Sequence, residues 1–191
     1  MSALAGIAID RGALPGADMP VLPKMDYASY ANPDPRKAQI TLSNFLSMSS
    51  GLNCNDHSAD SPRRETVIDD QPDWVKATLD LPMINDPGAK GYYCSGGVSV
   101  VGRLTENAAR MKLPDFAQAH LFTQLGIPRS NWQWNCDLTN ADKEYSQIHL
   151  RPATCSSSAS CSPTAESGMA AGSSRAPGSK PLPPNTATST T

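Results

Sequence analysis

Residues 87–102 read PGAKGYYCSGGVSVVG, and this stretch combines a turn, a short polar cluster and the start of a helix. The Pro-Gly pair at its beginning is typical of a tight turn, and the paired glycines in its middle allow the backbone to bend closely. The apolar residues that follow have helical spacing, which predicts a long helix from about Ser95 to Met111. The stretch therefore places a tyrosine, Tyr93, and a serine, Ser95, beside the entrance of a helix.

A second stretch, residues 40–52, reads ITLSNFLSMSSGL. Its residues Leu42, Phe45 and Leu46 repeat at helical spacing, and Gly51 is placed to close the turn that follows. Similar spacing predicts three further helices: Met1–Asp10, a helix that Asp73 can cap, and a helix from about Pro114 to Gly126. The alternation of apolar residues permits two short strands, which contain Trp132, Trp134, Ile148 and Leu150.

Both stretches resemble segments of one known family. Residues 87–102 are similar to the P-G-x-x-F-x-Y-S-N-x-G-Y-x-L-L-G element of the serine β-lactamase and penicillin-recognising hydrolase family, which contains class C β-lactamases, D,D-peptidases and small-ester hydrolases. Residues 40–52 resemble the I-T-I/L-x-x-L-L-T-M-T-S-G-L segment of the same family. With further matches at residues 73–76 and 113–127, the resemblance runs from about Met1 to about Pro152.

The resemblance implies an α+β fold in which a helical subdomain packs over an α/β subdomain, with the active site in the groove between them. In relatives the sheet is built from the two chain ends, which these residues do not match. We therefore expect this chain to be mainly α-helical, with most of the sheet missing. A helical subdomain without its partner exposes apolar surface, so we also expect marginal stability and a tendency to aggregate.

The resemblance also implies a chemistry, which is acyl transfer through a serine ester during hydrolysis of a β-lactam, a small ester or a D-Ala peptide. Tyr93 occupies the position of the family's catalytic tyrosine. Ser95 stands where most members carry an asparagine, whose amide accepts a hydrogen bond from the catalytic lysine and donates one to the substrate. A serine hydroxyl can do both more weakly. Tyr93 and Ser95 are therefore the candidate catalytic residues.

The nucleophile of that family lies in a Ser-x-x-Lys motif, and this sequence contains no such motif. The family's third element, Lys or His followed by Ser or Thr and then Gly, is also missing after Tyr93. Residues 1–12 resemble the part of the helix that follows Ser-x-x-Lys in relatives, which would place the serine a few residues before Met1. We interpret the chain as truncated at both ends and expect it to be inactive alone.

Composition and charge argue against several other classes of function. The 191 residues carry 16 basic and 18 acidic side chains, a formal net charge of -2, and no basic stripe that would indicate a nucleic-acid partner. No apolar run approaches the roughly 18 to 20 residues of a membrane-spanning helix, and no export signal is evident. Relatives are often periplasmic or secreted, so the location stays open between those compartments and the cytoplasm, as does the oligomeric state.

The cysteines show no recognisable pattern of disulfides or metal ligands. The five cysteines are Cys54, Cys94, Cys136, Cys155 and Cys161, an odd number without a CxxC pair or a histidine at ligand spacing. We expect neither a metal site nor a set of disulfides, and the family chemistry implies no cofactor. Cys94 is interpreted as a small buried residue rather than a nucleophile.

The chain changes character at about Pro152. Residues 153–191 form a tract rich in Ser, Thr, Pro, Ala and Gly, which lacks the apolar surface to offset an ordering entropy of about 1 to 2 kcal/mol per residue. We expect a partial hydrolase domain over residues 1–152 and a disordered tail over residues 153–191. A shifted reading frame, a fusion or a linker-like segment would each explain such a tail.

Two other functions stay open beside the serine hydrolase. One is a non-catalytic remnant or binding module that keeps the helical subdomain, and the other is an esterase with another serine as nucleophile. Ser49 and Ser50 are candidates for that serine, although no G-x-S-x-G motif surrounds them and a helix-ending role explains them better. The remaining polar candidates are interpreted as structural or solvated: His57, His120, His149 and the turn at residues 34–37.

Overall fold

The computed structural model describes residues 1–59, 61, 71–136 and 145–151. Its elements are α1 Ser2–Asp10, η1 Leu22–Lys24, η2 Pro35–Gln39, α2 Leu42–Leu46, α4 Trp74–Leu79, α5 Ser95–Ala109, α6 Leu113–Ala117, the π-helix η3 Gln118–Phe122, η4 Arg129–Asn131, β1 Trp132–Cys136 and β2 Tyr145–Leu150. The predicted division at about Pro152 and the predicted disordered tail lie outside the described residues.

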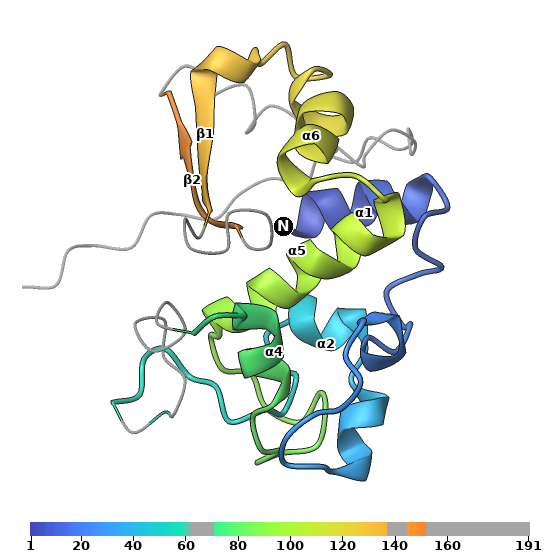
Figure 1. The fold of residues 1–191 in the computed structure, drawn as a ribbon, viewed down its shortest axis with the longest axis vertical. Helices are drawn as coiled ribbons and strands as arrows, with labels where there is room; N and C mark the ends of the chain where they lie inside the picture. Colours follow the sequence, from blue (N-terminus) through green and yellow to red (C-terminus); the bar gives the residue numbers. More distant parts are fainter. Residues whose placement is uncertain (60, 62–70, 137–144, 152–191) are drawn as a thin grey trace, which may run out of the picture. The chain divides into compact units, whose positions relative to one another are not determined.

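Helix α5 is the element on which the other α-helices pack (Figure 1). It contacts α1, α2, α4 and α6. A Cβ on Gly97 would lie 3.2 Å from Phe45 Cδ1 of α2, and a Cβ on Gly102 would lie 3.3 Å from Leu113 Cδ2 of α6. These two glycines therefore let neighbouring helices approach α5 closely. The rest of its buried face includes Val100, Val101 and Leu104.

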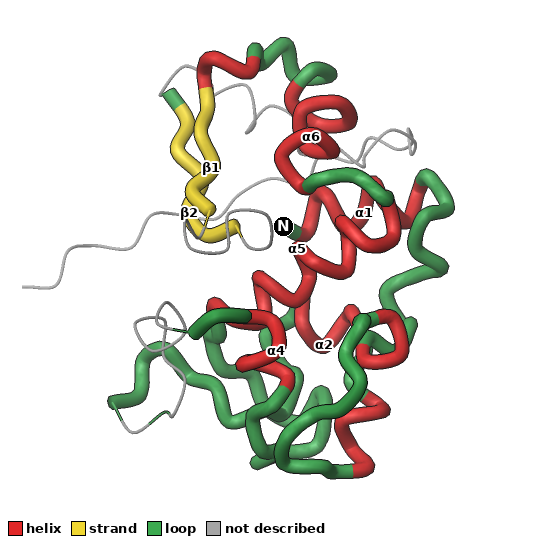
Figure 2. The backbone as a smooth tube through the Cα atoms, viewed as in Figure 1, coloured by secondary structure: helices red, strands yellow, loops and turns green. Residues whose placement is uncertain are grey.

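The expectation of a mainly helical chain is confirmed (Figure 2). Within the described residues the only sheet has two strands, and helices are present at each of the places that the sequence predicts. The long helix ends at Ala109, two residues before the predicted Met111, and Asp73 caps α4 by accepting a hydrogen bond from the Lys76 N–H.

Strands β1 and β2 form an antiparallel hairpin, as the alternating apolar residues permit. Trp132 pairs with Leu150 and Trp134 pairs with Ile148. The Trp132 ring lies 4.6 Å from the Phe122 ring, measured between centroids, and is 5% exposed. The buried Trp132 therefore anchors the hairpin to the π-helix η3, which contains Phe122.

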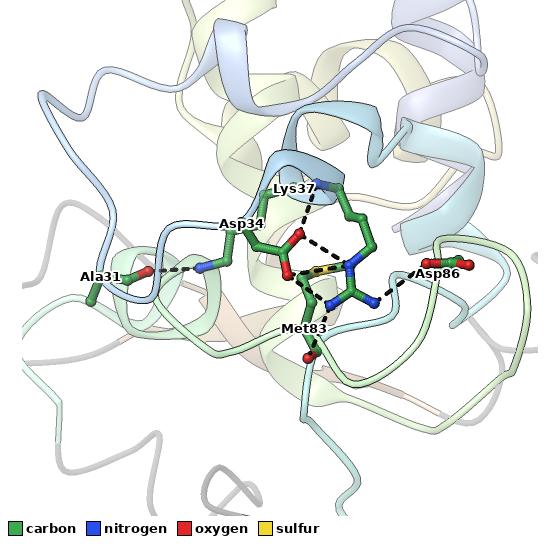
Figure 3. A network of polar contacts seen from close by, with 6 residues as sticks. Ala31, Asp34, Lys37, Met83 and Asp86 are labelled. Atoms are coloured by element: carbon green, nitrogen blue, oxygen red, sulfur yellow. Dashed lines mark hydrogen bonds and ion pairs between the residues drawn. The ribbon is translucent and has the colours of Figure 1, made fainter.

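Residues 34–37, expected to be a solvated turn, instead begin the 3-10 helix η2 and bury one of their side chains, that of Lys37. Lys37 is only 3% exposed. Its Nζ donates a hydrogen bond to the Ala31 carbonyl oxygen at 2.8 Å (Figure 3) and another to the Leu79 carbonyl oxygen, also at 2.8 Å. Burial lowers the pKa of the Lys37 ammonium. The expectation was wrong because a lysine can be buried where carbonyl oxygens converge on its ammonium, and a local sequence pattern does not show that convergence.

Asp34 and Arg36, in the same segment, form an ion pair (Figure 3). The Asp34 carboxylate accepts from the Arg36 backbone N–H at 2.8 Å and from Arg36 Nη2 at 2.7 Å. Arg36 also contacts the carboxylate of Asp86 at 3.3 Å. The hydrogen bonds from the side chain and backbone of Arg36 lower the pKa of Asp34 from 3.8 to about 2.

The Asp34→Asn variant is expected to make folding less sensitive to acid. Because the folded-state pKa of Asp34 is depressed, its contribution to stability is complete above its unfolded-state pKa of 3.8 and is lost as the pH falls through about 2. Asparagine can still cap the helix start but carries no charge. Urea midpoints across that pH range should fall less steeply for the variant than for the parent chain, and parallel curves would contradict this account.

Candidate functional site

Tyr93 and Ser95 lie together at the start of α5, as the sequence predicts. Ser95 is the first residue of the helix, and Tyr93 stands two residues earlier. The Tyr93 side chain is 50% exposed, so its ring is not part of the core. Among the described residues the Tyr93 hydroxyl makes no hydrogen bond. The phenol is therefore half-exposed and has no hydrogen-bond partner in the part of the chain that the structure describes.

A disulfide joins Cys54 to Cys94, the residue between Tyr93 and Ser95. The two Cα atoms lie 5.4 Å apart, and the sequence separation is 40. The sequence led us to expect no set of disulfides, and this one bond was not predicted; Cys94 is buried, as expected, but it is not a free thiol. An odd number of cysteines is compatible with one disulfide and unpaired remainders, and two cysteines 40 residues apart form no recognisable spacing motif. The bond holds the segment after residues 40–52 against the start of α5.

Asp56, which the sequence analysis did not single out, contacts both candidate residues. Its backbone N–H donates to the Tyr93 carbonyl oxygen at 2.9 Å. Its Oδ2 accepts from the backbone N–H of Ser95 and from the Ser95 hydroxyl, each at 2.7 Å. A carboxylate at this place satisfies an unpaired N–H of the first helical turn and interacts favourably with the helix dipole. Nothing in the sequence around Asp56, which follows Cys54 by two residues in a polar loop, indicates that its carboxylate binds the start of α5.

His57 follows Asp56 and brings a second ring to Tyr93. The ring centroids of His57 and Tyr93 lie 5.8 Å apart with the planes tilted by 36°. The backbone N–H of His57 donates to Asn55 Oδ1 at 3.1 Å, which fixes the local turn. His57 was interpreted as structural from the sequence, and the structure places it beside the candidate catalytic tyrosine. The other two histidines are not among the ring contacts of Tyr93.

The two stretches that resemble the family lie side by side. The backbone N–H of Tyr92 donates to the Met48 carbonyl oxygen, and that of Gly88 donates to the Ser49 carbonyl oxygen, each at 2.8 Å. Ser49 and Ser50 are 7% and 9% exposed, so neither hydroxyl is presented to solvent. Their burial supports a structural role over a role as nucleophile.

Two hollows lie beside α5, and each is lined by residues of α5 and of other segments. The larger, of about 350 Å³, includes Leu14, Lys24 and Asn107, and the smaller, of about 190 Å³, includes Tyr27 and Asn107. Neither is lined by Tyr93 or Ser95. No group of three or more His, Cys, Asp or Glu side chains is placed to hold a metal ion in the part of the chain that the structure describes. None of the described helices is long and apolar enough to cross a membrane.

Comparison of the sequence with family models identifies the class of protein. The family model described as Beta-lactamase matches residues 2–152. The chain therefore belongs to the β-lactamase family. A comparison with curated proteins gives no significant match.

Solved structures show the same fold. A putative β-lactamase from Bacteroides dorei superposes with a TM-score of 0.59 at 21% identity, over 83% of this chain and 45% of that one. A β-lactamase/D-alanine carboxypeptidase from Yersinia pestis gives a TM-score of 0.59 at 16% identity, over 82% of this chain and 49% of that one. A hydrolase with promiscuous acyltransferase activity gives 0.52 at 21% identity, over 75% and 42%. The chain thus spans less than half the length of these proteins and is a mainly helical portion of the β-lactamase fold.

Proposed function

We propose that this chain forms the tyrosine-bearing side of a serine hydrolase active site, which hydrolyses a β-lactam, a small ester or a D-Ala peptide through a serine ester. In this site Tyr93 transfers protons and Ser95 accepts a hydrogen bond from the catalytic lysine. The attacking serine and the lysine come from a Ser-x-x-Lys segment, which is not among these 191 residues. Residues 1–152 are the hydrolase portion, and residues 153–191 are a separate tail.

The observation that carries the proposal is the placement of the Tyr93 phenol. Its ring is half-exposed, its hydroxyl has no partner among the described residues, and its backbone is held by the Cys54–Cys94 bond and by Asp56. A tyrosine that only filled space would bury its ring and bond its hydroxyl to a nearby group. A fixed backbone with an open phenol instead suits a group that exchanges protons with a substrate.

The proposed reaction needs a cation beside this phenol. The serine Oγ attacks the substrate carbonyl carbon, and its proton passes by way of Tyr93 and the lysine to the leaving amine or alcohol as the C–N or C–O bond breaks. Water then hydrolyses the ester. A phenol is a weak base at neutral pH unless an opposite charge favours its ionised form, so Tyr93 requires the lysine for this role.

The position of Met1 is compatible with a site shared with a preceding segment. A Cβ on Gly102 would lie 3.2 Å from Met1 Cε, so Met1 lies beside the middle of α5 (Figure 1). Seven residues of helix separate Gly102 from Ser95, which is about 10 Å at the helical rise. Because residues 1–12 resemble the later part of the helix that begins with Ser-x-x-Lys, the preceding residues would continue helix α1, and about seven helical residues span that distance. A Ser-x-x-Lys segment joined ahead of Met1 would therefore be able to reach Tyr93.

Covalent labelling tests the proposal against the two alternatives. A fluorophosphonate probe and a labelled penicillin, mapped by mass spectrometry, are expected to leave the 191-residue chain unlabelled, because none of its serines stands three residues before a lysine. A label on any of its serines would favour the esterase with another nucleophile. The DNA directly upstream of Met1 is expected to encode an in-frame Ser-x-x-Lys, and its absence there would favour the non-catalytic remnant.

A further inference from the structure

We propose that Asp56 is the positioning residue of the Tyr93–Ser95 pair and holds the Ser95 hydroxyl as a hydrogen-bond acceptor for a cationic group. The catalytic meaning of this arrangement rests on the proposed function above. Its structural part concerns the chain as it exists and can be tested without any activity.

Three hydrogen bonds connect Asp56 to the pair. The Asp56 backbone N–H donates to the Tyr93 carbonyl oxygen at 2.9 Å. The Asp56 Oδ2 accepts from the Ser95 backbone N–H and from the Ser95 hydroxyl, each at 2.7 Å. Cys94, the residue at the helix cap position, makes no side-chain capping bond of its own. Asp56 therefore replaces the missing cap from a segment 39 residues away and fixes the residues on both sides of Cys94.

The bond to Asp56 determines which hydrogen bonds Ser95 can still make. A serine hydroxyl has one proton and two lone pairs, and the ionised carboxylate of Asp56 can only accept. The Ser95 proton is therefore committed to Asp56 Oδ2, which leaves the lone pairs of Oγ for an incoming donor. The negative charge behind this oxygen strengthens its attraction for an ammonium group. Ser95 cannot at the same time donate to a substrate carbonyl, which favours small esters over substrates that need such a donor.

The second carboxylate oxygen of Asp56 points to the same kind of partner. Oδ1 is buried and has no hydrogen-bond partner among the described residues. A buried acceptor without a donor costs about 1 to 3 kcal/mol. A cationic group beside Ser95 would offset part of this cost through its charge, without a hydrogen bond to the buried Oδ1. The same segment also orients the phenol, because the ring of His57 contacts the ring of Tyr93.

The test uses NMR on the full chain with tyrosines labelled at Cζ. The Tyr93 signal is assigned as the one that is missing from the spectrum of the Tyr93→Phe variant. Asp56→Ala is expected to speed amide exchange at Ser95 about tenfold or more and to shift the Tyr93 signal. Asp56→Asn, whose amide oxygen can accept the same two bonds, should restore both readouts to near those of the parent chain. The Cys54–Cys94 bond keeps the two segments joined in each variant, and the Tyr27 signal reports that the fold is intact.

The outcomes separate positioning from capping. If Asp56→Ala exposes the Ser95 amide while the Tyr93 signal and its contact with His57 stay unchanged, Asp56 is only a helix cap and the inference is overturned. The same holds if Asp56→Asn fails to rescue. If the Tyr93 signal responds and recovers as expected while no Ser-x-x-Lys exists upstream of Met1, the positioning stands and the proposed function fails.

Discussion

Gly51→Ala is expected to lower the free energy of unfolding by about 3 kcal/mol. Gly51 has a φ of 82°, a left-handed conformation that costs a residue with a Cβ about 1 to 2 kcal/mol. A Cβ there would also overlap the carbonyl oxygen of Asn85 and lie 3.0 Å from Met83 Cε. The backbone cannot give way easily, because the Gly51 carbonyl oxygen accepts from the N–H groups of Ile84 and Asn85.

Gly12→Ala is the matched control for this prediction. Gly12 has a φ of 72°, but a Cβ there would meet nothing within 4 Å. The control should therefore lose only the conformational part, about 1 to 2 kcal/mol. Urea unfolding of both variants measures the difference. Equal losses would show that the contact with Asn85 does not constrain the loop that carries the Tyr93 stretch.

Replacing both cysteines of the disulfide by serine is expected to cost on the order of 4 kcal/mol. The bond closes a loop with a sequence separation of 40, and loop-closure entropy of the unfolded chain gives about that magnitude. Such a loss is a large fraction of a typical domain stability of about 5 to 15 kcal/mol. The double variant should also loosen Tyr93, because Cys94 is its direct neighbour in the chain.

The reducing agent dithiothreitol provides the control for the disulfide. Reduced parent chain and double variant should have nearly the same urea midpoint, since both lack the same cross-link. The unreduced parent should unfold at higher urea. If reduction leaves the parent midpoint unchanged, the Cys54–Cys94 bond does not stabilise the fold as described here.

The helices could be predicted from the sequence because their causes are local. The apolar spacing in α5 and α2, the cap at Asp73 and the glycines that end segments act within a few residues. The burial of Lys37 could not be predicted in the same way. Its ammonium is held by the carbonyl oxygens of Ala31 and Leu79, and the second of these lies 42 residues away.

The residues of the candidate site likewise fall into those that a local pattern predicts and those that it does not. Tyr93 and Ser95 could be found because a continuous motif carries them. The groups that hold them, Cys54, Asp56 and His57, belong to a polar loop about 40 residues earlier. Pairing at that distance depends on the fold that α5 and α2 create, so no spacing rule in the sequence indicates it.

The acylation rate of a longer chain tests the central claim about Tyr93 most directly. That chain includes a Ser-x-x-Lys segment ahead of Met1 and the strands that complete the sheet, with Tyr or Phe at position 93, and it is mixed with a labelled penicillin or an activated ester. Proton transfer by a positioned side chain contributes about 100-fold to 10,000-fold in rate. We expect Tyr93→Phe to slow acylation by at least about 100-fold while the fold is unchanged. Equal acylation rates for the two chains would contradict that claim.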